Sequence, residues 1–117
     1  MIIMNNCLFC KIIAGDIPSA KVYEDEKVYA FRDINPQAPT HVLVIPKQHV
    51  TGMSGIDETD DATLAACLRA CKKVAELEGL TENGFRVVSN CGDHACQSVH
   101  HLHFHVLGGR QLTENMA

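Results

Sequence analysis

Apolar residues recur along this chain with two different periods, one typical of helices and one typical of strands. In residues 59–78 they fall every three or four positions, which places them on one face of a helix. Asp57, Thr59 or Asp60 can cap the start of this helix, and Gly79 is suited to end it. The pattern therefore predicts one long amphipathic helix.

A shorter helix and five strands complete the predicted elements. Residues 8–14 have helical spacing, and Gly15 and Pro18 break that run. Elsewhere, β-branched and aromatic residues gather in short segments between turn residues, which is the pattern of strands. The five predicted strands are residues 21–24, 28–32, 40–45, 85–90 and 100–107.

The order of these elements favours an α+β fold. The first three strands follow one another closely, which predicts an antiparallel meander, and the last two form a hairpin after the long helix. All five strands would then join one antiparallel sheet. A chain of 117 residues fits one domain spanning residues 1–117, and the sequence contains no internal repeat or linker.

Composition and charge narrow the possible functions. The chain has 10 Lys and Arg against 14 Asp and Glu, a net charge of -4, and no basic run, so we expect no nucleic-acid partner. The first residues, MIIMNN, lack the basic segment of a signal peptide, and their apolar run is too short for a membrane span. We therefore expect a cytoplasmic protein with no membrane partner, whose six cysteines stay reduced.

Alternating histidines mark the last predicted strand. In an extended segment, His101, His103 and His105 point to one face, while the apolar residues between them point to the core. Successive imidazoles would lie about 6.6 Å apart, a separation that brackets a phosphate group. A neutral imidazole can attack phosphorus and form a covalent intermediate that water resolves, provided that its other ring nitrogen has an acceptor.

Two other interpretations of this histidine row stay open. An H-x-H pair on a strand can chelate zinc, as in a metal-dependent hydrolase, although no nearby carboxylate supplies the usual third ligand or base. The row can also be an exposed polar strand face without chemistry. We favour the nucleophile, because three histidines at alternate positions are hard to explain by structure alone.

Residues 97–110 (QSVHHLHFHVLGGR) resemble the signature of the histidine triad (HIT) superfamily, and the resemblance extends over nearly the whole chain. Residues 31–41 (FRDINPQAPTH) and 43–47 (LVIPK) are similar to its nucleotide-binding (HINT) branch. The resemblance implies an α+β fold whose five-stranded sheet joins that of a second copy in a homodimer. It also implies binding of purine nucleoside monophosphates and hydrolysis of purine nucleoside 5'-phosphoramidates, with no cofactor in catalysis.

The resemblance also implies roles for individual residues. His103 matches the nucleophile, His105 matches the histidine that contacts the phosphate, and Ser98 matches a serine near the phosphate and the leaving group. His41 matches a histidine behind the triad, and Asp33 matches the carboxylate that binds the ribose. The other matches are polar residues on the phosphate side, Asn90 and Gln97, and apolar walls around the base, Leu8, Phe9, Ile12, Phe31, Ile34 and Leu43. Without the resemblance, we would interpret Asp33 as a turn residue and the apolar wall residues as part of the hydrophobic core.

A second candidate site is the pair Cys7 and Cys10, which has the C-x-x-C spacing of zinc ligands. Taken alone, the pair can also be two ordinary thiols or a redox pair. Some members of the superfamily bind zinc through such a pair, a histidine after the Pro-Lys segment and the first triad histidine. The resemblance thus implies a structural zinc held by Cys7, Cys10, His49 and His101.

The chain departs from the family pattern in the loop before the triad. Cys96 stands where the family usually has glycine beside the phosphate, so its side chain is expected to crowd that loop. Cys91 lies in the same loop, and either thiol could oxidise or bind a metal. Two rival functions stay open besides a zinc-dependent hydrolase: a nucleotide-binding regulatory module with vestigial catalysis, and a dinucleoside polyphosphate hydrolase.

Overall fold

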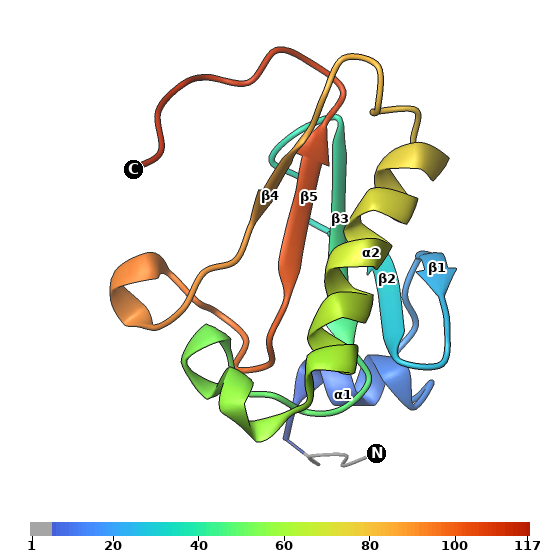
Figure 1. Ribbon diagram of the computed structural model, residues 1–117, viewed down its shortest axis with the longest axis vertical. Coiled ribbons are helices and arrows are strands. Elements are labelled where there is room, and N and C mark those ends of the chain that lie inside the picture. Colours follow the sequence, from blue (N-terminus) through green and yellow to red (C-terminus); the bar gives the residue numbers. More distant parts are fainter. Residues whose placement is uncertain (1–5) are drawn as a thin grey trace.

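The computed structural model describes residues 6–117; residues 1–5, on which much of the expectation of no signal peptide rests, lie outside the described part. The described elements follow the predicted order (Figure 1). They are α1 (Leu8–Ile13), β1 (Lys21–Glu24), β2 (Val28–Arg32), β3 (Thr40–Pro46), the 3-10 helix η1 (Met53–Glu58), α2 (Asp61–Leu77), β4 (Arg86–Val88), the 3-10 helix η2 (Asp93–Ala95) and β5 (Phe104–Gly108).

The strands form one five-stranded antiparallel sheet in the order β1-β2-β3-β5-β4. The meander and the final hairpin are as predicted. The hairpin joins the sheet through β5, which pairs with β3 and leaves β4 at the edge. On β3, His41 lies opposite Leu107 and Leu43 lies opposite His105, so these four side chains share one face.

Each face of the sheet has its own apolar cluster. Helix α2 crosses one face, as Figure 1 shows, and packs on residues such as Val42, Val44 and Val106. The other face carries a second cluster, which includes Phe9 of α1 and Leu43 of β3. The triad histidines belong to this second face, because strand residues alternate between the two faces.

The ends of α2 follow from local chemistry. The Asp60 side chain caps its start by accepting a hydrogen bond of 2.8 Å from the backbone N–H of Thr63. Gly79, with φ of +70°, terminates it in the left-handed conformation that favours glycine. The long helix is thus confirmed, with slightly tighter bounds than the predicted 59–78.

The two strands of the last hairpin are shorter than predicted. β5 begins at Phe104 rather than at residue 100, so His101 and His103 precede the sheet ladder. The reason is that the backbone N–H of Leu102 donates to the carbonyl of Val50 at 2.6 Å, in a loop outside the sheet. β4 covers only residues 86–88 of the predicted 85–90. The prediction that all three triad histidines lie on one regular strand was therefore wrong.

Candidate active site

Three histidine rings lie in a row on the α1 face of the sheet. The ring centroids of His103 and His105 are 5.1 Å apart, and those of His105 and His41 are 5.0 Å apart. His41 and His103 are buried, while His105 is partly exposed. The structure therefore brings together the three histidines to which the sequence assigned the chemistry, although they come from β3, β5 and the segment before β5.

A chain of hydrogen bonds fixes the tautomers of two of these rings. The backbone N–H of Gln37 donates to His41 Nδ1 at 3.0 Å, so the proton of the neutral His41 ring lies on Nε2. His41 Nε2 is 2.8 Å from His105 Nδ1, to which it then donates. His105 consequently carries its own proton on Nε2, where the ring can donate to a ligand.

The tautomer of His103 is set by a backbone carbonyl. His103 Nδ1 lies 2.7 Å from the carbonyl oxygen of His101, and only an N–H can make this hydrogen bond. The lone pair of the neutral ring is therefore on Nε2. This is the arrangement that a nucleophilic imidazole needs, since the acceptor behind it stabilises the positive charge that develops on attack.

Burial keeps these rings neutral near pH 7. It lowers the pKa of His105 to about 4, with further lowering by the neighbouring His103 and His41. Burial also lowers the pKa of His103 and His41, although the charge of Asp33 acts in the opposite direction on both. Neutral imidazole is the form that can attack an electrophile, so the site is in a reactive protonation state at neutral pH.

The apolar residues assigned to the base-binding walls do not all lie together. Phe9, Ile12, Phe31 and Leu43 are buried in one cluster, and the Phe9 ring also contacts His103 edge-to-face with centroids 5.1 Å apart. Leu8 is 44% exposed at the start of α1. Ile34 is fully exposed in the turn after β2 and does not pack with the cluster.

Asp33 combines the two interpretations that the sequence left open. Its Oδ1 accepts a hydrogen bond of 2.8 Å from the backbone N–H of Asn35, as a turn residue does. Its Oδ2 is 3.4 Å from His41 Nε2, at the end of the histidine row. The carboxylate is half-buried and stays accessible to a ligand beside His105.

The polar residues of the loop before the triad have unequal surroundings. Ser98 is exposed and Asn90 is half-buried. Gln97 is buried, and its amide is already committed: Oε1 accepts from the backbone N–H of Gly92 at 2.9 Å, and Nε2 donates to the carbonyls of Thr51 at 2.9 Å and Val99 at 3.2 Å. Gln97 therefore fastens this loop to residues 50–52, a contact that nothing in the sequence pattern indicated.

The four predicted zinc ligands meet in one place. Their ligand atoms all lie within 4.8 Å of one another. Cys7 Sγ is 3.4 Å and Cys10 Sγ is 3.6 Å from His101 Nδ1, and Cys10 Sγ is 3.3 Å from His49 Nδ1. A tetrahedral zinc with bonds of about 2.3 Å to sulfur and about 2.0 Å to nitrogen separates these atoms by about 3.6 Å. The spacing therefore fits zinc.

The protonation of His101 also fits a metal. Its Nε2 lies 2.8 Å from the carbonyl oxygen of Pro46 and therefore carries the proton, which turns the Nδ1 lone pair toward the thiols. The other group with metal-ligand spacing, Asp33, His41 and His105, is less suitable. His41 Nδ1 accepts a backbone N–H, so its Nε2 carries a proton and has no lone pair to give. Among the described residues, Cys91 and Cys96 belong to neither group.

Comparison with known proteins places this geometry in a family. Residues 14–112 match the model of the HIT domain. The chain belongs to the HIT family.

The relatives of this HIT protein carry names that bear on both sites. It is 56% identical to a 14 kDa zinc-binding protein of Zea mays over 90% of this chain and 83% of the relative. It is 51% identical to the adenylylsulfatase HINT1 of Arabidopsis thaliana, over 90% and 72% respectively. It is 43% identical to a purine nucleoside phosphoramidase of Escherichia coli K12, over 94% and 92%.

A solved structure confirms the fold of the HIT domain. A HIT family hydrolase from Clostridium thermocellum superposes with a TM-score of 0.93 at 46% identity, covering 97% of this chain and 99% of that one. The chain is thus a HINT-like HIT hydrolase with the five-stranded antiparallel sheet described above. Among the described residues, no helix is long and apolar enough to cross a membrane.

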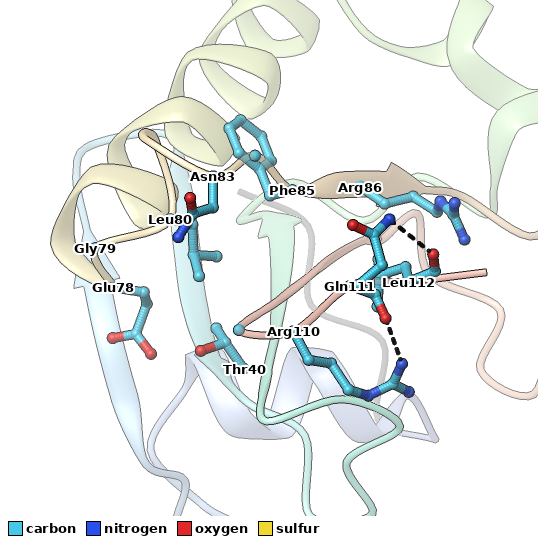
Figure 2. A pocket seen from close by; sticks show the side chains of 12 residues that line it. Thr40, Glu78, Gly79, Leu80, Asn83, Phe85, Arg86, Arg110, Gln111 and Leu112 are labelled. Atoms are coloured by element: carbon cyan, nitrogen blue, oxygen red, sulfur yellow. Dashed lines mark hydrogen bonds between the residues drawn. The ribbon is translucent and has the colours of Figure 1, made fainter. Parts of the chain in front are cut away.

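A cavity of about 700 Å³ in this HIT domain lies away from the histidine row. It lies between the residues that follow α2 and the residues that follow β5. Figure 2 shows Arg86, Arg110 and Gln111 along it. The arginines are engaged with the backbone: Arg110 donates to the carbonyl of Gln111 at 3.1 Å, and Arg86 donates to that of Thr113 at 2.7 Å. None of the predicted site residues lines this cavity.

Proposed function

We propose that this HIT protein hydrolyses purine nucleoside 5'-phosphoramidates, releasing the nucleoside monophosphate and an amine through a nucleotidyl intermediate on His103. The observation that carries the proposal is the His103 tautomer, with Nδ1 on the carbonyl of His101 and the Nε2 lone pair available for attack. The name of the Escherichia coli relative supports this substrate class.

The reaction follows in two displacements at phosphorus. His103 Nε2 attacks, the P–N bond breaks, and the amine leaves after taking a proton from solvent. The resulting cationic ring is stabilised by its Nδ1–H bond to the His101 carbonyl. Water then attacks the same phosphorus and loses a proton to solvent, the bond to Nε2 breaks, and the nucleoside monophosphate leaves with the neutral ring restored.

His105 and His41 stabilise the phosphate in this scheme. The hydrogen-bond chain from the Gln37 amide directs a proton to His105 Nε2, from which it can be donated to a non-bridging phosphate oxygen. Ser98, exposed on the preceding loop, is assigned to the leaving-group side. Asn90, which is half-buried, is assigned to the phosphate.

The nucleoside occupies the apolar side of the row. Asp33 accepts the ribose hydroxyls, because its Oδ2 is beside the histidines and still partly accessible. The cluster of Phe9, Ile12, Phe31 and Leu43 forms the wall for the base, with Leu8 at its rim. An apolar wall with a few converging polar groups is the usual form of a small-molecule site.

Zinc held by Cys7, Cys10, His49 and His101 has a structural role in this proposal. When bound, it would join α1 to the segment before β5. The donor set and spacing support zinc, as does the name of the Zea mays relative. All four positions are then used by protein ligands, so the ion has no open position for substrate.

A homodimer is the proposed assembly. β4 is an edge strand with one unpaired side, and Phe85 and Val87 are 38% and 40% exposed there. Pairing of two β4 strands would cover both features and make a ten-stranded sheet. Size-exclusion chromatography with light scattering tests this assembly directly.

A second substrate is supported by the name of the Arabidopsis thaliana relative. In adenylyl sulfate the same phosphorus would be attacked by His103, and sulfate rather than an amine would leave. The two substrates share the nucleotidyl intermediate and differ only in the leaving group. Parallel assays with both therefore measure the specificity of one site.

The deciding experiment is hydrolysis of a fluorogenic adenosine 5'-phosphoramidate by the wild type, His103→Ala and His100→Ala, each with and without a chelator. His100 is exposed and lies three residues from His103, so it is a matched control. We expect turnover to be abolished only in His103→Ala, while the chelated wild type keeps a measurable rate. Wild-type binding of AMP without turnover would instead identify a binding module, and complete loss of turnover in folded, chelated wild type would support zinc catalysis.

A further inference from the structure

His101 is shared between the Cys/His cluster and the catalytic site. Its fully buried ring has Nδ1 3.4 Å from Cys7 Sγ, and Nε2 on the carbonyl of Pro46. Its own main-chain carbonyl accepts the hydrogen bond of 2.7 Å from His103 Nδ1. His101 therefore belongs to the Cys/His cluster through its side chain and holds the proposed nucleophile through its backbone carbonyl.

The sheet does not hold the backbone of residues 101–103. β5 begins only at Phe104, and the backbone N–H groups of His101 and Leu102 donate outside the ladder, to the carbonyls of Val99 at 2.9 Å and of Val50 at 2.6 Å. In a regular strand, paired backbone groups would fix the direction of the His101 carbonyl. Here the Leu102 N–H, which lies in the same peptide plane as the His101 carbonyl, is held by Val50, and the anchored His101 ring is a second constraint on the direction of that carbonyl.

Helix α1 provides a second connection. Its cap is Cys7, whose Sγ accepts a hydrogen bond from the backbone N–H of Cys10 at 3.4 Å. Between these two cysteines, Phe9 contacts His101 with ring centroids 5.9 Å apart and His103 with centroids 5.1 Å apart. Any ion that binds both thiols also sets the position of Phe9 against the nucleophile.

We propose that zinc bound by Cys7, Cys10, His49 and His101 sets the turnover rate by positioning His103, without taking part in the reaction. With zinc, the His101 carbonyl stays directed at His103 Nδ1, and Nε2 keeps its lone pair toward phosphorus. Without zinc, weaker contacts with thiols replace the metal bond, and His103 spends part of its time with the proton on Nε2, which cannot attack. His101 is thus a positioning residue.

The test compares zinc-loaded protein with protein that lacks zinc in three ways: chelation of the wild type, His49→Ala and Cys10→Ala. His49 lies outside both α1 and the triad segment, but its ring also contacts that of His101 with centroids 4.9 Å apart, so the chelated wild type is the sample that loses zinc alone. Cys67→Ala is the matched control, because Cys67 is a buried helical cysteine that packs on the opposite face of the sheet. The chelated wild type requires no variant to fold.

Four quantities are measured on each sample: zinc content, kcat and KM for adenosine 5'-phosphoramidate, and the His103 tautomer by ¹⁵N NMR. We expect loss of zinc to lower kcat about tenfold with little change in KM, as for other residues that orient a reacting group indirectly. The spectrum should change from the Nδ1–H form to a mixture of both forms. Adding zinc back to the chelated wild type should restore kcat in proportion to occupancy.

Unchanged kcat and an unchanged His103 tautomer in folded, zinc-free protein would overturn this inference. So would an equal fall of kcat in Cys67→Ala with its zinc retained. The activity measurement rests on the proposed function, whereas the tautomer measurement does not. If zinc-loaded wild type fails to cleave the phosphoramidate, the proposed function is wrong, and the spectra with and without zinc still decide whether the cluster controls His103.

Discussion

Gln97 offers a sharp test of how the loop before the triad is held. The family resemblance assigns it to the phosphate side of the site, but its amide makes three hydrogen bonds with the backbone, to Gly92, Thr51 and Val99. Replacing Gln97 with alanine removes all three and leaves two carbonyls and one N–H without these partners. The geometry therefore predicts a loss of stability rather than a simple loss of phosphate affinity.

The size of the effect follows from the number of bonds. At about 1 kcal/mol for each hydrogen bond, Gln97→Ala lowers the free energy of unfolding by about 3 kcal/mol. For a chain of this length, that corresponds to a fall in Tm of about 12 °C. Gln97→Glu should be at least as destabilising, because it keeps the acceptor for Gly92 but places a carboxylate oxygen against the carbonyls of Thr51 and Val99.

Urea unfolding at fixed zinc and protein concentrations measures these changes. Gln37→Ala is the control, since its exposed amide makes one side-chain hydrogen bond, to the Asn35 carbonyl at 3.1 Å, and we expect a change within about 0.5 kcal/mol. A Gln97→Ala protein with wild-type stability and a raised KM would refute the reasoning. In that case Gln97 would contact the phosphate, as the resemblance implies.

Two further predictions concern pH and the loop conformation. Burial lowers the folded-state pKa of His105 to about 4. The free energy of unfolding should therefore have its full value above about pH 6.5 and fall as the pH drops toward 4, because the unfolded chain takes up the proton first. Urea titrations should show a loss of stability that is smaller by about 3 kcal/mol in His105→Asn, since the lowered pKa of His101 contributes in both proteins; equal losses in both proteins would contradict it. Cys96 has φ of +63°, so Cys96→Gly should raise the unfolding free energy by up to about 1 kcal/mol and Cys96→Val should lower it. The opposite order of urea midpoints would show that this conformation is not strained.

The elements and the chemical groups were predictable from the sequence, because both are encoded locally. The spacing of apolar residues predicted α2, and alternation predicted the strands and the apolar core positions between the triad histidines. The resemblance gave the family and the four residues of the Cys/His cluster, which meet, whereas Ile34 of the predicted base wall lies apart from the others. The strand bounds around the triad were wrong, since the partner of the Leu102 amide is Val50, about fifty residues away, rather than a strand neighbour.

The tautomers of the histidines, and the contact of His101 with the cysteines, were decided only by the tertiary structure. Alternate spacing predicts that histidines share a face, but the proton on His103 lies on Nδ1 because a loop places the His101 carbonyl 2.7 Å away. The His41 proton is likewise set by an amide in the preceding turn. His101 meets Cys7 across 94 positions of sequence, and no local pattern encodes that distance. The sequence therefore specified which groups the site contains, while long-range contacts determined which nitrogen of each ring can react.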